Sequence, residues 1–137
     1  MYKIVLVMVL LCLSTSVFAS QTQCDDHYTK EGSFFSGRTF HAWKEYPGMP
    51  EDLTFDKVSQ AVMRLGFTIT NSNKAAGLLS ASHGVMGSPA TVPLNVIITA
   101  QGNGSRVELT FAPQGGVFMS ESRVTSGFCD IFNAVTP

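Results

Sequence analysis

Two stretches of the sequence place their apolar residues on one stripe of a helix. The first stripe consists of Phe55, Val58, Ala61, Val62 and Leu65. Thr54 suits the N-cap of this helix, and Gly66 stands where a left-handed residue commonly ends one. The second stripe consists of Val124, Phe128, Ile131, Phe132 and Val135. Both patterns predict amphipathic helices that each bury a single face.

Between the two stripes, and just before the first, apolar and polar residues alternate as in strands with one buried face. The alternating segments are 38–46, 67–70, 77–83, 92–101 and 106–111. Residues 101–105 carry two glycines and an asparagine, which predicts a hairpin turn between the last two segments. Residues 21–37 are polar and irregular in pattern, and residues 117–119 are a candidate for a short final strand.

This order of elements predicts a two-layer α+β domain, in which four to five antiparallel strands carry both helices on one face. Each predicted helix has only one apolar stripe, so packing both helices on the same face of the sheet buries both stripes at once. The length of the chain fits a single domain of this kind.

The N-terminus has the three parts of a secretory signal. Lys3 precedes an apolar run over residues 4–13, and Ala19 ends a segment of small residues suited to cleavage. The run is about half of the roughly 20 residues that a membrane-spanning helix needs. We therefore expect residues 1–19 to be removed and residues 20–137 to form the mature domain. Lipid attachment at Cys12 or Cys24 is less favoured, because neither cysteine follows a small residue.

Two cysteines, Cys24 and Cys129, stay in the mature chain. An exported protein with one cysteine pair favours a single disulfide, and only one pairing is available. It would close a loop of about 105 residues, for which chain entropy gives about 4 to 5 kcal/mol of stabilisation. A redox-active pair is the alternative, but it normally shows Cys-x-x-Cys spacing, which is absent here. The sequence thus predicts a disulfide-closed protein that is periplasmic or secreted.

The charge of the chain is close to neutral. The formal net charge is −1, and loss of Lys3, the only charged residue before Ser20, leaves −2. Nucleic acids and anionic membrane surfaces both select proteins with a basic excess or a basic patch. Charge therefore argues against both as partners.

One segment resembles a known structural unit. Its residues are Val58, Ala61-Val62, Leu65-Gly66-Phe67-Thr68-Ile69, Asn73-Lys74 and Gly77-Leu78-Leu79-Ser80-Ala81. They resemble the helix–strand–strand unit of small bacterial envelope proteins and lipoproteins, including domains like those of the C-subunit lipoprotein of the outer-membrane barrel assembly machinery. The resemblance covers about a fifth of the mature chain. It implies a periplasmic protein with a helix-grip-like fold and a non-enzymatic role, although the chain departs from these proteins in lacking a lipidation signal and in its cysteine pair.

No pattern in the sequence predicts a catalytic, cofactor or metal site. His27, His41 and His83 lie in three different segments without the spacing of a zinc or copper site, so structural or surface roles are favoured. Ser82 and His83 are adjacent, but neighbours on a strand point to opposite faces and cannot form a catalytic dyad. We expect no enzymatic activity.

Aromatic residues crowd the segment that contains the first strand. Phe40, Trp43 and Tyr46 are the candidate surface for a partner or a ligand, although filling the core is the favoured role of this group. Trp43 alternates with Phe40 and Ala42, which places it on the other face of the strand.

These observations favour a non-enzymatic envelope domain that binds a protein partner or supports an assembly. The alternative is a protein that binds a small apolar ligand between its sheet and its helices, and an enzyme is the third possibility. An apolar cavity of roughly 300 Å³ or more would favour the ligand. A solid core with an exposed aromatic strip would favour the protein partner.

Overall fold

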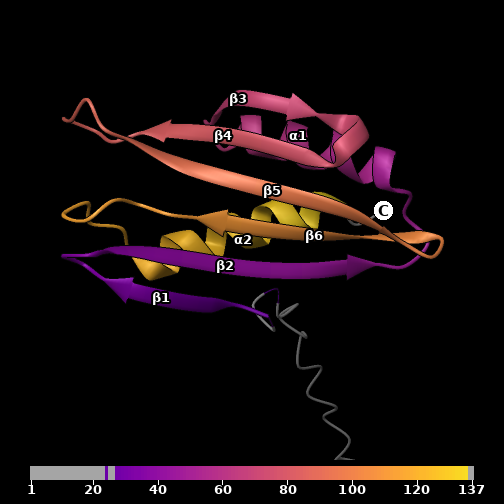
Figure 1. Cartoon of the computed structure of the whole chain (residues 1–137), viewed down its shortest axis with the longest axis horizontal. Coiled ribbons are helices and arrows are strands. Elements are labelled where there is room, and N and C mark those ends of the chain that lie inside the picture. Colours follow the sequence, from indigo (N-terminus) through magenta and orange to yellow (C-terminus); the bar gives the residue numbers. More distant parts are fainter. Residues whose placement is uncertain (1–23, 25–26, 136–137) are drawn as a thin grey trace, which may run out of the picture.

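A six-stranded antiparallel sheet carries two helices on one face (Figure 1). The computed structural model describes Cys24 and residues 27–135; the predicted signal peptide, residues 1–19, lies outside them. In chain order the elements are β1 (Thr29–Ser33), β2 (Gly37–Tyr46), α1 (Glu51–Arg64), β3 (Thr68–Asn73), the 3₁₀ turn η1 (Lys74–Ala76), β4 (Leu78–Gly84), β5 (Thr91–Gln101), β6 (Gly104–Phe111) and α2 (Glu121–Val135). The spatial order of the strands is β1-β2-β6-β5-β4-β3. The predicted two-layer α+β architecture is confirmed.

The sheet has one more strand than the largest predicted number. The extra strand is β1, in a segment whose sequence reads as irregular, and it pairs along the outer edge of β2. All five residues of β1 are exposed, so neither face selects apolar side chains and no alternation marks the strand. Residues 117–119, the candidate final strand, adopt no regular structure.

Helix α1 ends as the sequence predicts but begins earlier. The backbone of Gly66 is left-handed, with φ +86°, and its N–H donates to the carbonyl of Met63 at 3.0 Å. Thr54 is not the N-cap: Pro50 occupies that position, and the N–H of Thr54 donates to the Pro50 carbonyl at 2.9 Å. The Thr54 side chain instead enters the core, where its hydroxyl lies 2.7 Å from that of Ser105 on β6.

The core fills the space between the sheet and the helices. Alternate residues of the central strands point into it, as the sequence pattern predicts, while their neighbours face outward. The buried strand residues are Phe40, Ala42 and Tyr46 of β2, Leu79 and Ala81 of β4, Val92, Leu94, Val96 and Ile98 of β5, and Val107, Leu109 and Phe111 of β6. The apolar stripes of α1 and α2 close the layer from the other side.

The predicted disulfide joins Cys24 to Cys129, whose Cα atoms are 5.3 Å apart. It attaches the segment before β1 to the middle of α2, 105 residues later. The apolar stripe of α2 packs the same helix against the sheet. The disulfide and the core packing therefore both hold α2 in place. No helix in the described part of the chain has the length and apolar character needed to cross a bilayer.

The strand register sorts the loops to two ends of the molecule. Phe111 at the end of β6 pairs with Phe40 near the start of β2 and with Leu94 near the start of β5. The same end, on the left in Figure 1, therefore holds the β1–β2, β4–β5 and β6–α2 loops together with the end of α1. The opposite end holds the β5–β6 turn, the start of α1 and the end of α2.

Candidate functional site

A pocket of about 340 Å³ lies between the sheet and the N-terminal half of α2. Leu94 and Phe111 line it from the sheet, Phe67 from the segment after α1, and Val124 and Phe128 from α2. The wall is thus mainly apolar, and it is built from the same residues that form the core nearby. This volume lies within the range typical of small-ligand sites, about 300 to 1,000 Å³.

A glycine in α2 leaves room for part of this space. Gly127 lines the pocket between the inward-facing Val124 and Ile131. A Cβ atom built on Gly127 would meet no atom within 4 Å, so the space beside it is open. Glycine in a helix interior costs about 1 kcal/mol relative to alanine. The absence of a side chain at this position therefore opens space at a cost to helix stability.

Polar side chains gather on the rim of the pocket. Arg123, Ser126 and Asp130 follow one exposed flank of α2, and His83 approaches from the end of β4. His83 Nδ1 lies 2.7 Å from the carbonyl oxygen of Gly84. A carbonyl can only accept a hydrogen bond, so Nδ1 carries the hydrogen and Nε2 of the neutral ring is left as an acceptor. The site combines an apolar interior with a rim that offers both donors and acceptors.

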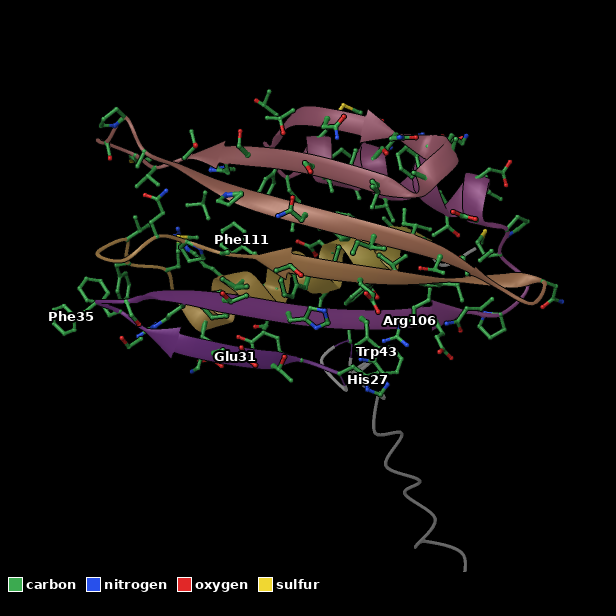
Figure 2. The ribbon with its side chains drawn as sticks, in the orientation of Figure 1. His27, Glu31, Phe35, Trp43, Arg106 and Phe111 are labelled. Atoms are coloured by element: carbon green, nitrogen blue, oxygen red, sulfur yellow. A yellow bond between two sulfur atoms is a disulfide. The ribbon has the colours of Figure 1, made fainter. Side chains whose placement is uncertain are left out.

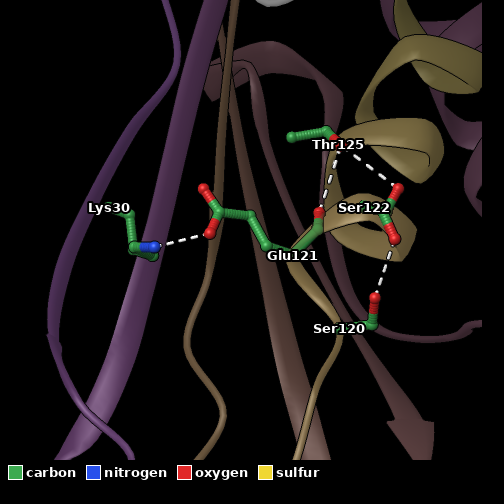
Figure 3. Close-up of polar contacts among 5 residues, drawn as sticks. All are labelled: Lys30, Ser120, Glu121, Ser122 and Thr125. Atoms are coloured by element: carbon green, nitrogen blue, oxygen red, sulfur yellow. Dashed lines mark hydrogen bonds and ion pairs between the residues drawn. The ribbon is translucent and has the colours of Figure 1, made fainter.

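The first turn of α2, which borders the pocket, is held by several polar contacts (Figure 3). Ser120 Oγ lies 2.8 Å from Ser122 Oγ, and Lys30 Nζ of β1 contacts Glu121 Oε2 at 2.5 Å. The hydrogen bond from Lys30 holds the pKa of the Glu121 carboxyl below its usual range. This ion pair is half exposed and so stabilises the turn only weakly. The buried Val124 and Phe128 therefore supply most of what fixes the wall.

The far end of the same helix layer is closed by buried hydrogen bonds. The Tyr46 hydroxyl donates to the carbonyl of Phe132 at 2.7 Å, and Thr54 pairs with Ser105. Burial raises the pKa of Tyr46 above its ordinary value. We call this the closed end, and we call the opposite end, where the three loops and the pocket lie, the pocket end.

The structure separates the three aromatic residues that the sequence groups as a candidate surface. Phe40 and Tyr46 are buried in the core, with exposed fractions of 0% and 7%, and Trp43 lies on the outer face of the sheet (Figure 2). Phe40 packs beside Phe111 of the pocket wall, with the ring centroids 6.4 Å apart, but does not itself line the pocket. The three residues therefore do not form one surface.

Both faces of the Trp43 ring are covered. The His27 ring stacks on it with centroids 3.5 Å apart, and the Arg106 guanidinium lies 3.9 Å from the same centroid. Two groups this close to one centroid must occupy opposite faces of the ring. Figure 2 shows Trp43 between these two residues. The arrangement fixes the segment before β1 to the outer face of the sheet and leaves no ring face free for a partner.

The three histidines are not brought together. His27 stacks on Trp43, His41 lies on the outer face of β2, and His83 lines the pocket. Within the described residues, no group of three or more His, Cys, Asp or Glu side chains is arranged to hold a metal ion. The prediction that the protein is not an enzyme stays a prediction.

Sequence reasoning missed the residues that shape the pocket. Gly127 interrupts the apolar side of an otherwise regular helix, and that signal was available in the sequence. Arg123 and Asp130 look like ordinary exposed residues of an amphipathic helix. Only the placement of α2 over the ends of β4, β5 and β6 gives them a place in the site.

Comparison with known proteins supports the fold alone. No protein-family model and no curated protein matches the chain. Among solved structures, CalU16 from Micromonospora echinospora is similar with a TM-score of 0.57 and 14% sequence identity, covering 80% of each chain. Ara h 8.0201 is similar with a TM-score of 0.50 and 13% identity, covering 73% of this chain and 95% of its own. Both are helix-grip-like folds, so the predicted fold class is confirmed.

Proposed function

We propose that this protein binds a small apolar ligand in the pocket between the sheet and α2. The observation that carries the proposal is the apolar space of about 340 Å³ beside Gly127. The pocket is partly open to solvent, so a ligand could enter it without unfolding the core. A concave, mainly apolar pocket with a few polar groups is the usual form of a small-ligand site.

The chemistry of the rim limits the ligand. Arg123 and Asp130 have opposite charges and lie on one flank of α2, two helical turns apart. A ligand with several charges of one sign would be repelled by one of these side chains. The site therefore suits an apolar body with a small polar head group, which the Ser126 hydroxyl or His83 Nε2 could meet at the rim. Helix-grip-like proteins commonly bind apolar ligands, which also supports the proposal.

We infer that binding takes place outside the cytoplasm. The N-terminal signal pattern and the Cys24–Cys129 disulfide are two separate features that favour export. The relation to bacterial envelope proteins and a role with a protein partner stay predictions. Of the residues assigned to a partner surface, two are buried and the third is covered on both ring faces.

Two substitutions at Gly127 test the ligand proposal. Gly127→Phe would project an aromatic ring into the pocket, whereas Gly127→Ala adds one methyl group where space is open. The measurement is titration of the mature protein with 1-anilinonaphthalene-8-sulfonate and with a fluorescent fatty alcohol. We expect the wild type and Gly127→Ala to bind the fatty alcohol equally, and Gly127→Phe to bind it at least tenfold more weakly because its ring occupies the site.

The fold of each variant is checked by near-ultraviolet circular dichroism, since partly unfolded proteins also bind such probes. Equal binding of the fatty alcohol by a folded Gly127→Phe variant would place the binding elsewhere. Absence of binding by the wild type, both to the probes and to lipids of an envelope extract examined by native mass spectrometry, would overturn the proposal.

A further inference from the structure

The three loops at the pocket end share an unusual composition. They comprise residues 33–37, 84–90 and 112–120, and none of these positions holds a charged residue or a histidine. Each loop exposes one large apolar side chain. These are Phe35, Met86 and Phe118, with exposed fractions of 89%, 100% and 74%. Isolated exposed apolar residues are common, but three in neighbouring charge-free loops require a reason.

The loops lie together at one end of the sheet. The N–H of Gly116 donates to the carbonyl of Phe34 at 2.9 Å, and that of Arg38 to the carbonyl of Pro113 at 3.3 Å, which joins the first and third loops. The second loop follows the pairing of Gly84 with Thr91, at the same end of the sheet. Figure 1 shows all three loops on the left, and Figure 2 shows Phe35 projecting beyond the strands there.

The same loops border the pocket. Met119 lines it and directly follows the exposed Phe118. On the other side, His83 and Val92 line it from the strand ends that flank the second loop. The pocket wall therefore begins next to these loops. An apolar molecule that moved from a surface touching the loops would reach the pocket directly.

We propose that the pocket end docks on a lipid bilayer by inserting Phe35, Met86 and Phe118 among the lipid chains. Protein interfaces are also enriched in aromatic residues and Met, but they pack these into one continuous centre together with Arg and surround it with a hydrogen-bonding polar rim. These loops offer three separate apolar tips and no charged group, which matches a lipid surface better. Docking on a bilayer goes beyond the proposed binding of an apolar ligand. Only transfer of a ligand from the bilayer into the pocket rests on that proposed function.

The missing charges determine which bilayer suits the surface. Anionic membranes attract proteins through lysine and arginine, and that attraction weakens with salt. With no basic residue in the three loops, insertion depends on apolar burial. Docking should therefore occur on electrically neutral phosphatidylcholine vesicles and should change little with salt.

Flotation with phosphatidylcholine vesicles tests the surface. The loop variant is Phe35→Ser, Met86→Ser and Phe118→Ser combined. The matched control is Leu53→Ser, Leu78→Thr and Ile97→Thr, three side chains that are 42% to 44% exposed and lie away from the three loops. We expect the wild type and the control to float with the vesicles at low and high salt. The loop variant should partition at least about a thousandfold more weakly, since each of its three lost insertions removes about a factor of ten or more.

The proposal is overturned if the wild type stays in solution with neutral vesicles, or if the loop variant floats as well as the control. A wild type that stays in solution but captures an envelope protein through these loops would assign the surface to a protein partner. Probe titration separates the two proposals. The loop variant should keep its affinity for the dissolved fatty alcohol, while Gly127→Phe should lose that affinity and still float.

Discussion

The two ends of the molecule use the same sheet and the same two helices differently. At the closed end, Tyr46 and Thr54 form buried hydrogen bonds, and Lys74 and Asp56 form an ion pair at 2.8 Å. At the pocket end the corresponding space between the sheet and α2 is an apolar cavity, and the surrounding loops carry no charge. The buried polar contacts thus lie at one end of the fold, and the open apolar space lies at the other.

The physical origin of the difference lies in how the helix ends are satisfied. Phe132 is among the last four residues of α2, whose carbonyls have no partner inside the helix, and the Tyr46 hydroxyl supplies one. At the start of α2, the Ser120 carbonyl accepts from the N–H groups of Arg123 and Val124, and the Ser120 hydroxyl lies beside that of Ser122; none of these contacts reaches the sheet. The space behind it can therefore stay apolar and partly empty.

The largest expected effect comes from removing the disulfide, which lies between the two ends on α2. Replacing Cys24 and Cys129 with serine should lower the free energy of unfolding by about 4 to 5 kcal/mol, because the unfolded chain regains its loop entropy. Chemical denaturation of the mature protein measures this loss. Where the variant is folded, probe binding should be unchanged. Lost binding by a folded variant would show instead that the disulfide shapes the pocket.

Two leucines on adjacent strands allow a comparison between the packing of the core and the packing around the pocket. Leu79 and Leu94 are both 1% exposed, but only Leu94 lines the pocket. Leucine-to-alanine changes in a core cost about 2 to 5 kcal/mol. We expect Leu79→Ala to lower the free energy of unfolding by an amount in the upper part of this range. Leu94→Ala should lower it by an amount in the lower part, because Leu94 already lacks contacts on its pocket side. Equal losses in thermal and chemical unfolding would indicate that the pocket is closed in solution.

Two tyrosines allow a comparison between a buried hydroxyl that makes a regular hydrogen bond and one that does not. Tyr46→Phe removes the donor to the Phe132 carbonyl and should cost about 1 to 3 kcal/mol, since a buried acceptor is left unsatisfied. The Tyr28 hydroxyl is buried near the Glu121 carboxylate but makes no hydrogen bond of regular geometry among the described residues. Tyr28→Phe breaks no such bond and removes a buried hydroxyl, so it should not lower the free energy of unfolding. If both variants lose the same free energy, the Tyr46 bond does not stabilise the closed end.

The fold followed from the sequence wherever burial imposed a period on it. Strands β5 and β6 and both helices have one buried face and one solvent-exposed face, so the spacing of their apolar residues identifies them. Strand β1 has no buried residue and left no pattern. Thr54 fits the composition of an N-cap, but its buried pairing with Ser105, 51 residues away, could not be inferred from local sequence. The disulfide was predictable because only one pairing exists.

The site was far less predictable than the fold. Its residues come from the ends of separate helices and strands. The local pattern of each element already explains them as ordinary core or surface residues. Trp43 is the only tryptophan in the sequence, yet both faces of its ring are covered by His27 and Arg106. Gly127 carries the only local signal of the pocket, and its meaning depends on the sheet behind it.

At alkaline pH the same two tyrosines report on their surroundings. Burial, assisted by the negative charge of Glu121, raises the pKa of Tyr28 to about 12, and burial alone raises that of Tyr46 further. A raised pKa means that the folded protein favours the neutral phenol. The resulting stabilisation is complete below pH 10, the ordinary value, and is lost as pH rises through the folded pKa.

Residues 20–137 contain no other tyrosine, so each Tyr→Phe variant leaves one reporter in the mature chain. Absorbance of the phenolate should appear near pH 12 in Tyr46→Phe. In Tyr28→Phe it should appear only at still higher pH, together with unfolding, because the closed end must open before Tyr46 can ionise. Ionisation of Tyr46 near its ordinary pKa in a folded protein would show that water reaches the closed end, and the contrast between the two ends would then fail.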